Sequence, residues 1–559
     1  MKGPSQRISN ETHAEKYRLA GESFEQLVYR LAAALNDGES HRLALKYILG
    51  EMRFLPAGRI QNAIGSPRAT TGFNCFVSSP IEDSMSSIMQ RAAEAAETMR
   101  RGGGIGFDFS EIRPRGELIS SLGSRASGPI SFMHIFDAVC STIKSAGHRR
   151  GAMMGVLRCD HPDIEKFVMA KQTLGALTGF NVSVGITDEF MRCLGSDEKF
   201  PLRFEGRTFE WIDPQALWDM IMRSTWDFAE PGVIFLDTVN RMNNLWYCEK
   251  IAATNPCGEQ PLPPAGACLL GSFNLVKYIT GDRQFDYKQL ENDIPHVVRA
   301  MDNVNDRTVF PLEAQKREAQ AKRRMGLGVT GLANAGEILS KPYASAGFLN
   351  FTSEVLRTIA ECSYVASSEL AHEKGSFPAF DREKYLQSES LQKFYARGMT
   401  AYNLVARYGI RNSHLTSIAP TGTISLCADN VSSGIEPPFR LRYDREIVGF
   451  DDTIVEEVTD YAFREFGVRG KTANQLSAQE HLSVLATAQQ WVDSAVSKTC
   501  NVGSDVSFSE FRSLYYDAWK LGCKGLTTFR EDGKRSGILR AKEDESCRYD
   551  PETGVRTCE

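Results

Sequence analysis

Apolar residues recur along this chain at two different spacings, and the two spacings alternate from the N-terminus onward. Residues 24–31 repeat apolar positions at helical spacing, so residues 1–53 are expected to form a small helical cap. Residues 180–186 are apolar at alternate positions, which predicts a strand, and Asp188 opens a helix directly after it. Strands that alternate with helices over several hundred residues are typical of an α/β architecture with parallel strands.

The pattern between residues 54 and 109 predicts one helix framed by two strands. Residues 54–59 are expected to form a loop, and residues 72–77 a short strand that enters a core. A helix is expected to begin at residues 82–85 and to stop at the glycines of 102–104. Residues 105–109 then continue as a strand.

The composition is that of an ordinary globular protein, and it excludes several classes. The 559 residues are 42% hydrophobic and 24% charged, enough to bury a large core. Lys and Arg number 65 against 70 Asp and Glu, a net charge of −5, so we expect no nucleic-acid partner. The sequence has no apolar signal segment and no run of about 18 apolar residues, so we expect a cytoplasmic protein without membrane contact.

The thirteen cysteines are too few and too scattered for a secreted disulfide framework in a chain of this length. Neither C-x-x-C nor H-E-x-x-H occurs, so we predict no metal site made of protein ligands. Cysteines in a reducing compartment are either buried hydrophobic residues or chemically active ones. Their neighbours in the sequence must therefore decide between these two uses.

The densest group of chemically useful residues is the segment 255–260, with the sequence N-P-C-G-E-Q. In an extended segment alternate side chains share a face, so Asn255, Cys257 and Glu259 would point the same way. The intervening proline fixes one backbone angle, and the glycine lets the backbone pass close to a bulky group. Taken alone, the segment fits either a tight turn with a structural cysteine or a site built from an amide, a thiol and an acid.

Two further cysteines could meet this segment. Cys268 follows Cys257 by eleven positions in a strand-like run, which could return the chain alongside itself, and Cys75 lies in the predicted strand at 72–77. Residues 417–425 (S-I-A-P-T-G-T-I-S) are expected to form a strand that ends in a small-residue turn. The backbone amides and hydroxyls of such a turn suit a phosphate, and an ordinary strand-to-helix turn is the other interpretation.

Residues 326–331 match the G-x-G-x-x-G fingerprint of dinucleotide-binding folds. The motif follows a charged helical run at 317–324 instead of a strand, and no acidic residue is well placed about 20 positions beyond it. We therefore interpret these glycines as sites of close helix packing. A nicotinamide-dependent oxidoreductase ranks behind the other functions considered.

Four motifs occur in order: N-P-C-G-E-Q at 255–260, G-A-C at 266–268, P-T-G-T-I-S at 420–425 and G-I-E-P-P at 434–438. Through them the chain strongly resembles ribonucleotide reductase catalytic subunits, and most closely the adenosylcobalamin-dependent (class II) enzymes. The resemblance covers the chain from about Phe54 through the tail. It implies a ten-stranded α/β barrel over residues 54–535, made of two parallel five-stranded halves around a central finger loop.

The resemblance implies a thiyl-radical reaction on a ribonucleotide. Cys257 would carry the radical and abstract the hydrogen from C3′ of the ribose, once adenosylcobalamin has generated it. Glu259 would take the 3′-hydroxyl proton as general base, and Asn255 would hold the hydroxyls. Cys75 and Cys268 would supply the protons and two electrons that remove the 2′-hydroxyl as water, and would end as a disulfide.

The same resemblance gives the polar tail at 536–559 a redox role. Cys547 and Cys558 lie eleven positions apart in a segment that we expect to be mobile. They would reduce the oxidised active site by thiol–disulfide exchange and be reset by a thioredoxin- or glutaredoxin-like partner. A disordered tail with incidental cysteines is the alternative.

Missing motifs decide the class of reductase. Residues 525–530 lack the tyrosine pair of reductases that depend on a separate radical-generating subunit, and Tyr515 and Tyr516 are expected to pack in an amphipathic helix. Residues 535–538 do not resemble the context of a radical glycine, and no D-x-H-x-x-G motif supplies a histidine to replace the cobalamin's own base. The rivals are a subunit that needs a separate radical partner and a nucleotide-binding regulator without chemistry.

Substrate and effector positions are transferred from the family by motif. The substrate-contacting positions are Asn74, Cys75, Gly104, Asn255, Pro420, Thr421, Gly422, Thr423 and Ile424. The positions expected to hold a deoxynucleotide effector at the interface of a homodimer are Asp83, Ser84, Met85 and Arg113, with His148 and Arg149 in the loop that relays effector identity. That loop, 147–154, has the sequence G-H-R-R-G-A-M-M where G-K-R-R-G-A-N is common in the family, so its specificity rules are expected to differ. The chain length leaves little room for an N-terminal regulatory domain, and we expect no overall ATP/dATP switch.

Overall fold

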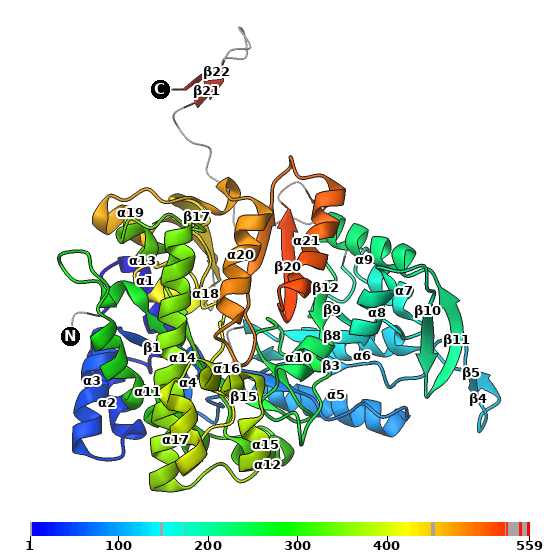
Figure 1. Ribbon diagram of the computed structural model, residues 1–559, viewed down its shortest axis with the longest axis horizontal. Coiled ribbons are helices and arrows are strands. Elements are labelled where there is room, and N and C mark those ends of the chain that lie inside the picture. Colours follow the sequence, from blue (N-terminus) through cyan, green and yellow to red (C-terminus); the bar gives the residue numbers. More distant parts are fainter. Residues whose placement is uncertain are drawn as a thin grey trace.

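The computed structural model describes residues 3–145, 149–173, 175–448, 453–530, 533–534, 547–549 and 556–558. A sheet of ten strands runs through the molecule, with helices packed around it (Figure 1). Its strands are β1 (Phe54–Pro56), β2 (Cys75–Val77), β3 (Gly104–Asp108), β8 (Met153–Arg158), β9 (Phe180–Ile186), β12 (Gly232–Phe235), β15 (Ala267–Asn274), β16 (Met325–Thr330), β19 (Thr499–Val502) and β20 (Gly525–Arg530).

Parallel pairing dominates this sheet. Strands β2, β3, β8, β9 and β12 are parallel neighbours in that order, and β15–β16 and β19–β20 are parallel pairs as well. Antiparallel pairing joins β2 to β15, β12 to β20, and β1 to β15. Two isolated parallel bridges, Leu327 with Thr416 and Ile418 with Val496, extend the pairing beyond β16. The expected α/β class with a parallel-dominated sheet is therefore confirmed.

Helices surround the sheet, and the two longest of those described are α11 and α14, with 21 and 29 residues. They are α1 (Arg7–Tyr17), α2 (Phe24–Leu35), α3 (Glu39–Gly50), α4 (Gly58–Ala63), α5 (Met85–Arg100), α6 (Pro129–Thr142), α7 (Ile164–Met169), α8 (Asp188–Cys193), α9 (Pro214–Phe228), α10 (Leu236–Arg241), α11 (Tyr287–Arg307), α12 (Glu313–Lys322), α13 (Leu332–Ile338), α14 (Ala346–Lys374), α15 (Arg382–Leu386), α16 (Glu389–Ala396), α17 (Thr400–Tyr408), α18 (Gly422–Cys427), α19 (Tyr461–Phe466), α20 (Ala478–Gln489) and α21 (Phe508–Lys520). Helices α2 and α3 contact α11 on one side of the molecule (Figure 1). No helix in the described part of the chain is long and apolar enough to cross a membrane.

Short two-stranded hairpins complete the fold. They are β4 (Leu118–Ile119) with β5 (Ser124–Arg125), β6 (Lys144–Ser145) with β7 (Arg149–Arg150), β10 (Phe200–Phe204) with β11 (Arg207–Ile212), β13 (Ala253–Thr254) with β14 (Pro261–Leu262), β17 (Arg442–Val448) with β18 (Thr453–Thr459), and β21 (Cys547–Tyr549) with β22 (Arg556–Cys558). Hairpin β10–β11 lies at the edge of the molecule near β4–β5 (Figure 1). Hairpin β13–β14 contains the segment 255–260, in which the sequence groups an amide, a thiol and an acid.

Several elements appear where the sequence pattern predicts them. Strand β9 spans the alternating segment, and α8 begins at Asp188. Helix α5 starts after Ser84, whose side chain accepts a hydrogen bond from the backbone N–H of Ser87. It ends at Arg100, and Gly102 turns the chain with a positive φ of 103° into β3. Local caps and glycines thus fix this part of the sheet.

The sequence pattern predicts a loop at residues 54–59, and this prediction is wrong. The segment forms strand β1 and the start of helix α4. Strand β1 lies at the edge of the sheet and pairs only with β15, where a proline such as Pro56 costs no ladder hydrogen bond to a second neighbour. The proline therefore marks an edge strand here, and not a break in structure.

The prediction that the glycines at 326–331 are sites of close helix packing is also wrong. Residues 325–330 form the buried strand β16, parallel to β15, and not a site where helices pack closely. Glycine alternates in this strand with Met325, Leu327 and Val329, which all belong to the main hydrophobic core. The other face of β16 is almost without side chains, which leaves room for the chain that packs on it.

A second, smaller hydrophobic cluster lies between the sheet and hairpin β13–β14. Its members come from both: Ala253 and Leu262 of the hairpin pack with side chains of β2, β8, β12 and β15. Strand β3 has no side chain at Gly106, and a Cβ there would lie 1.8 Å from the carbonyl oxygen of Thr254. The hairpin therefore packs directly against one face of the sheet.

Candidate active site

The loop 255–260 is the tip of hairpin β13–β14, and we call it the finger loop. The backbone N–H of Gly258 donates to the carbonyl oxygen of Asn255 at 3.0 Å, and that of Asn255 donates to Gln260 at 3.1 Å. The side-chain oxygen of Asn255 accepts a further bond from the backbone N–H of Gln260 at 2.9 Å. Asn255 therefore closes the loop as well as facing the site.

The finger loop is a turn and not the extended ribbon that we expected. Gly258 has a positive φ of 82°, which breaks the alternation of side-chain directions. As a result Cys257 is exposed, whereas Asn255 and Glu259 are almost fully buried. The amide and the acid point into the protein, and the thiol lies at the outer tip.

Contacts to two neighbouring strands hold the finger loop in place. A Cβ on Gly104 of β3 would lie 3.0 Å from the ring of Pro256, so the loop lies directly on this strand. Asn181 of β9 donates its side-chain amide to the carbonyl oxygen of Pro256 at 2.8 Å. Asn181 is not among the predicted site residues, because an asparagine in an otherwise apolar strand carries no local signal of its partner.

Cys75 and Cys268 meet beside the finger loop, as expected. They are register partners in the antiparallel pair β2–β15. The side-chain amide of Asn255 donates to Sγ of Cys75 at 3.1 Å, and the Cys75 thiol lies 3.7 Å from Oε1 of Glu259. The thiol of Cys268 donates to the carbonyl oxygen of Leu269 at 3.4 Å. Two thiols, an amide and a carboxyl group therefore share one buried space.

Burial sets the protonation of this group. It raises the pKa of Cys75 well above its usual range, and the nearby Glu259 carboxyl adds to the effect. Burial likewise raises the pKa of Cys268 well above the ordinary value, although the Arg324 guanidinium opposes this. Burial also raises the pKa of Glu259, while hydrogen bonds with Asn255 and Cys75 oppose the rise. The two thiols stay protonated at neutral pH and can act as hydrogen and proton donors.

The two carboxyl oxygens of Glu259 differ in their hydrogen bonding. Oε2 is buried and has no hydrogen-bond partner among the described residues. The side-chain oxygen of Asn74, which precedes Cys75, is in the same condition. The backbone N–H of Gly104 donates to the carbonyl oxygen of Asn74 at 3.0 Å, so these predicted substrate positions adjoin.

The predicted phosphate turn follows the strand-like segment at 416–418. Thr421 has a positive φ of 52° and precedes α18. Its hydroxyl lies 2.8 Å from that of Ser425 and 3.1 Å from that of Thr330, and it accepts from the backbone N–H of Gly434 at 2.7 Å. The turn is thus fixed from inside, while Pro420 is exposed.

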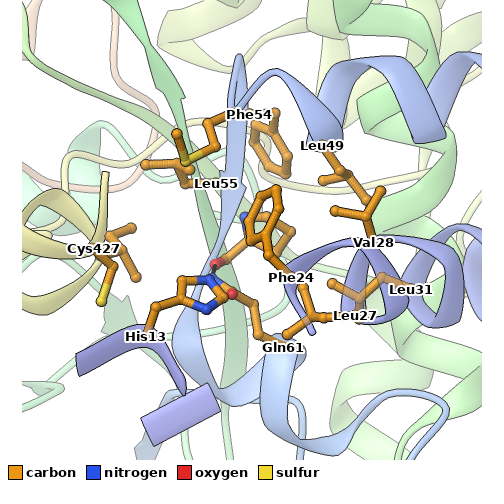
Figure 2. Close-up of a pocket in the computed structure, with 13 residues that line it drawn as sticks. His13, Phe24, Leu27, Val28, Leu31, Leu49, Phe54, Leu55, Gln61 and Cys427 are labelled. Atoms are coloured by element: carbon orange, nitrogen blue, oxygen red, sulfur yellow. Dashed lines mark hydrogen bonds between the residues drawn. The ribbon is translucent and has the colours of Figure 1, made fainter. Parts of the chain in front are cut away.

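Ile424 of this turn also lines an apolar pocket beneath it (Figure 2). The pocket lies between α2, α3, β1 and α18, and its few polar side chains include His13 and Gln61. Arg18 donates to Nδ1 of His13 at 3.1 Å, and burial lowers the pKa of His13 to about 3. No predicted catalytic residue lines this pocket. We therefore interpret it as part of the apolar packing under the turn, and not as part of the active site.

Four of the six predicted effector positions, Asp83, Ser84, Met85 and Arg113, come together at the start of α5. Arg113 donates its backbone N–H to Oδ1 of Asp83 at 3.1 Å, and its side chain forms an ion pair with the same carboxylate. Ser84 caps the helix, and Met85 is 61% exposed. His148 lies outside the described residues, and of Arg149 only the backbone, in β7, is described.

The tail cysteines are described through their backbone alone. Cys547 in β21 and Cys558 in β22 are register partners in a short antiparallel hairpin. Tyr515 lies on the buried face of α21, and its hydroxyl is 2.9 Å from that of Thr528 in β20. This tyrosine packs in the core, as its amphipathic helix predicted. Among the described residues no group of three or more His, Cys, Asp or Glu side chains could hold a metal ion.

A parallel-dominated α/β sheet packs against the finger loop, and the exposed thiol at the tip with two buried thiols beside it is the set of groups that an oxidoreductase working through cysteine chemistry needs. The family model for the ribonucleotide reductase barrel domain matches residues 73–529. The chain belongs to the ribonucleotide reductase family.

Relatives with known names agree with this assignment. The vitamin B12-dependent ribonucleoside-diphosphate reductase of Mycobacterium tuberculosis is 35% identical, over 94% of this chain and 78% of that protein. Its namesake from Thermoplasma acidophilum is 36% identical, over 84% of this chain and 62% of that protein. The ribonucleoside-diphosphate reductase subunit alpha of Chlamydia pneumoniae is 24% identical, over 90% of this chain and 56% of that protein.

Proposed function

We propose that this protein reduces ribonucleotides, as diphosphates, to 2′-deoxyribonucleotides with adenosylcobalamin as the source of the radical. The observation that carries the proposal is the pairing of Cys75 with Cys268 beside a finger loop that bears Cys257 and Glu259. Two relatives that are each more than a third identical are named vitamin B12-dependent ribonucleoside-diphosphate reductases.

Cys257 is the residue that would carry the unpaired electron. It is exposed at the tip, whereas Cys75 and Cys268 are buried, so a group that approaches the loop from outside meets Cys257 first. As a thiyl radical it would take the hydrogen atom from C3′ of the ribose. Because Cys257 is exposed, the bound cofactor and substrate would have to limit the access of water and of side reactions to that radical.

Glu259 would accept the proton of the 3′-hydroxyl as general base. Its Oε2 atom is buried without a partner in the described residues, and a substrate hydroxyl would supply one. Asn255, whose amide already contacts Cys75, would hold the ribose hydroxyls beside the carboxylate. The remaining substrate positions, from Asn74 and Gly104 to the turn 420–424, would hold the rest of the nucleotide.

Cys75 and Cys268 would supply the two electrons of the reduction. The C2′–O bond breaks, the oxygen leaves as water, and a hydrogen takes its place on C2′. The two thiols lose their hydrogens and form one disulfide, and Cys257 returns the abstracted hydrogen to C3′ and becomes a thiyl radical again, which balances the reaction. Register partners in an antiparallel pair have Cα atoms about 4.5–5.5 Å apart, within the range that a disulfide spans.

The finger tip has room for a bulky cofactor beside Cys257. A Cβ built on Gly258 would meet no atom within 4 Å, so the space outside this residue is open. We place Cys257 and Gly258 at the face that adenosylcobalamin would approach. When bound, this cofactor supplies an organic radical through cleavage of its cobalt–carbon bond.

Cys547 and Cys558 would restore the active site by thiol–disulfide exchange. Their positions opposite each other in β21 and β22 support a pair that is oxidised and reduced together. A thioredoxin- or glutaredoxin-like protein would then reduce the pair. With this role for the tail, we divide the chain into a helical cap (1–53), a catalytic barrel (54–535) and a redox tail (536–559).

A deoxynucleotide effector would bind near Asp83, Ser84, Met85 and Arg113, and its identity would reach the active site through the loop with His148 and Arg149. The exposed Met85 and Met89 on the outer face of α5 support a surface that a second copy of the chain would cover. Effector binding and dimer formation would then be linked.

The finer architecture that we propose is a closed barrel of ten strands. Strands β2, β3, β8, β9 and β12 would form one parallel half, and β15, β16, the segment 416–418, β19 and β20 the other. The bridges Leu327–Thr416 and Ile418–Val496 support closure, because they connect β16 with the chain that leads into β19. The finger loop would then pass through the centre.

The test is an assay of purified protein with nucleoside diphosphates and dithiothreitol, with and without adenosylcobalamin. Deoxynucleotide that forms only with the cobalamin supports the proposal. Turnover that needs an added radical-generating subunit instead would assign the chain to the other class of reductase. Nucleotide binding without turnover under either condition would indicate a regulator that has lost its chemistry.

A further inference from the structure

The glycine motif of β16 faces the finger loop. Alternate side chains of a strand share a face, so Gly326, Gly328 and Thr330 point away from the main core. A Cβ on Gly326 would lie 2.6 Å from the side-chain nitrogen of Gln260 and 2.8 Å from Cβ of Ser417. The absence of a side chain at this position therefore lets the finger loop and Ser417 pack on the strand.

Gly328 has the same effect one step further along. A Cβ there would lie 2.2 Å from the carbonyl oxygen of Ser417. The backbone of this segment is bonded to the strand, since Ser417 donates its N–H to the carbonyl oxygen of Leu327 at 3.0 Å. The two glycines therefore set how closely Ser417 approaches β16.

Ser417 in turn holds the backbone of the proposed general base. Its hydroxyl donates to the carbonyl oxygen of Glu259 at 3.0 Å, and the backbone N–H of Ala495 donates to the same oxygen at 3.0 Å. Ser417 and Glu259 are both almost fully buried, so water does not replace either bond. The carboxyl group of this same residue lies against the Cys75 thiol.

We propose that Ser417, seated on Gly326 and Gly328, is a positioning residue that fixes the Glu259 carboxyl group for proton transfer. The inference rests on the proposed role of Glu259 as general base. Loss of the hydroxyl leaves the backbone N–H of Ala495 as the one remaining donor to this carbonyl oxygen among the residues that the structure describes, so the backbone of Glu259 gains freedom. Proton transfer is sensitive to small displacements of the base, whereas nucleotide binding uses other residues.

The matched pair Ser417→Ala and Ser368→Ala tests this proposal in the full-length protein with adenosylcobalamin, a nucleoside diphosphate and dithiothreitol. Ser368 in α14 is the matched control, because it is also buried and its hydroxyl also donates to a backbone carbonyl oxygen, that of Gly409 at 2.8 Å. We expect Ser417→Ala to lower kcat by about tenfold, with KM for the nucleotide changed less than about twofold. Its acid limb in the pH profile of kcat should also shift, because the surroundings of Glu259 change. Ser368→Ala should leave kcat, KM and the pH profile as in the parent protein.

Gly326→Ala gives an independent reading if Ser417→Ala does not fold. The added methyl group must displace the end of Gln260 and Ser417, whereas Gly347→Ala places its Cβ no closer than 3.8 Å to any neighbour. We expect Gly326→Ala to lower kcat and Gly347→Ala to leave it unchanged. The double variant Ser417→Ala with Gly326→Ala should lose less than the product of the single losses, because both act through one contact.

The outcomes separate the two proposals. A parent protein that forms no deoxynucleotide refutes the proposed function. A parent protein that turns over, with an unchanged kcat and pH profile in Ser417→Ala, refutes the positioning role alone. Equal losses in Ser417→Ala and Ser368→Ala also refute it, since they would reflect a general loss of stability.

Discussion

Cys75 and Cys268 lie directly opposite each other in the antiparallel strands β2 and β15, and Asn255 of the finger loop donates its side-chain amide to Sγ of Cys75. Nothing in the sequence separation of these two residues would bring them together; the pairing of two sheet halves does so. A dithiol held by a rigid sheet can close to a disulfide with little movement of the backbone. The geometry therefore predicts a specific product of turnover.

In a Cys547→Ser, Cys558→Ser double variant without any added reductant, each active site should form one deoxynucleotide and then stop with a Cys75–Cys268 disulfide, because the tail can no longer reduce it. Peptide mapping by mass spectrometry after blocking of free thiols measures this product. Cys159, equally buried but remote in the core, should remain a thiol in the same sample. A disulfide that involves other cysteines, with Cys75 still reduced, would contradict the assignment.

Glu259→Gln should lower kcat by about 10²–10⁴-fold, the usual contribution of a general base. The amide keeps the shape of the side chain but accepts no proton. Because burial raises the pKa of Glu259, kcat of the parent protein should fall at a higher pH than for an ordinary carboxylate, as the base becomes protonated. A pH profile of kcat measures this acid limb, and the same limb in Glu259→Gln would assign it to another group.

Cys547→Ser should abolish turnover driven by a thioredoxin-like protein while dithiothreitol still sustains it. The small reductant reaches the active-site disulfide directly, whereas the protein reductant needs the tail as carrier. Steady-state rates with each reductant make the comparison, and Cys248→Ser serves as the exposed control. The tail has no carrier role if the two reductants fail to the same extent.

His13→Gln should make the protein less sensitive to acid. Burial and the nearby Arg18 lower the pKa of His13 to about 3, so the folded protein keeps this ring neutral while the unfolded chain protonates it below about 6.5. Stability is therefore fully present above pH 6.5 and falls as the pH drops, by about 2 kcal/mol at pH 5 from this residue alone.

Denaturant unfolding of the parent and variant proteins at pH 7.5 and pH 5 measures that difference. The exposed His372 on α14 provides the control, and His372→Gln should retain the acid sensitivity of the parent. An equal loss of stability in the parent and in His13→Gln would mean that other buried groups account for the effect.

Much of the sheet and of the catalytic group could be predicted from the sequence, because local chemistry specifies them. The alternation in residues 180–186 gives β9, and Ser84 gives the start of α5. The family resemblance implied that Cys75 and Cys268 act as a pair, and the register of β2 with β15 confirms that they meet.

Other features depended on contacts that no local pattern encodes. The exposure of Cys257 follows from the positive φ of Gly258, which turns the finger loop out of the extended form. Strand β16 was not predicted, because glycine alternates with apolar residues up to Gly328 and glycine is not typical of a strand. The glycines are explained by the packing of Ser417 and Gln260 on this face of the strand. The contact of Ser417 with Glu259 joins residues 158 positions apart, so it required the fold.

The most direct test of the central claim compares Cys257→Ala with the parent protein and with Cys248→Ala, which removes another exposed thiol. Deoxynucleotide is measured with a nucleoside diphosphate, adenosylcobalamin and dithiothreitol. We predict that Cys257→Ala forms none, while the parent and Cys248→Ala turn over equally. Deoxynucleotide formation by Cys257→Ala would contradict the assignment of Cys257 as the residue that carries the radical.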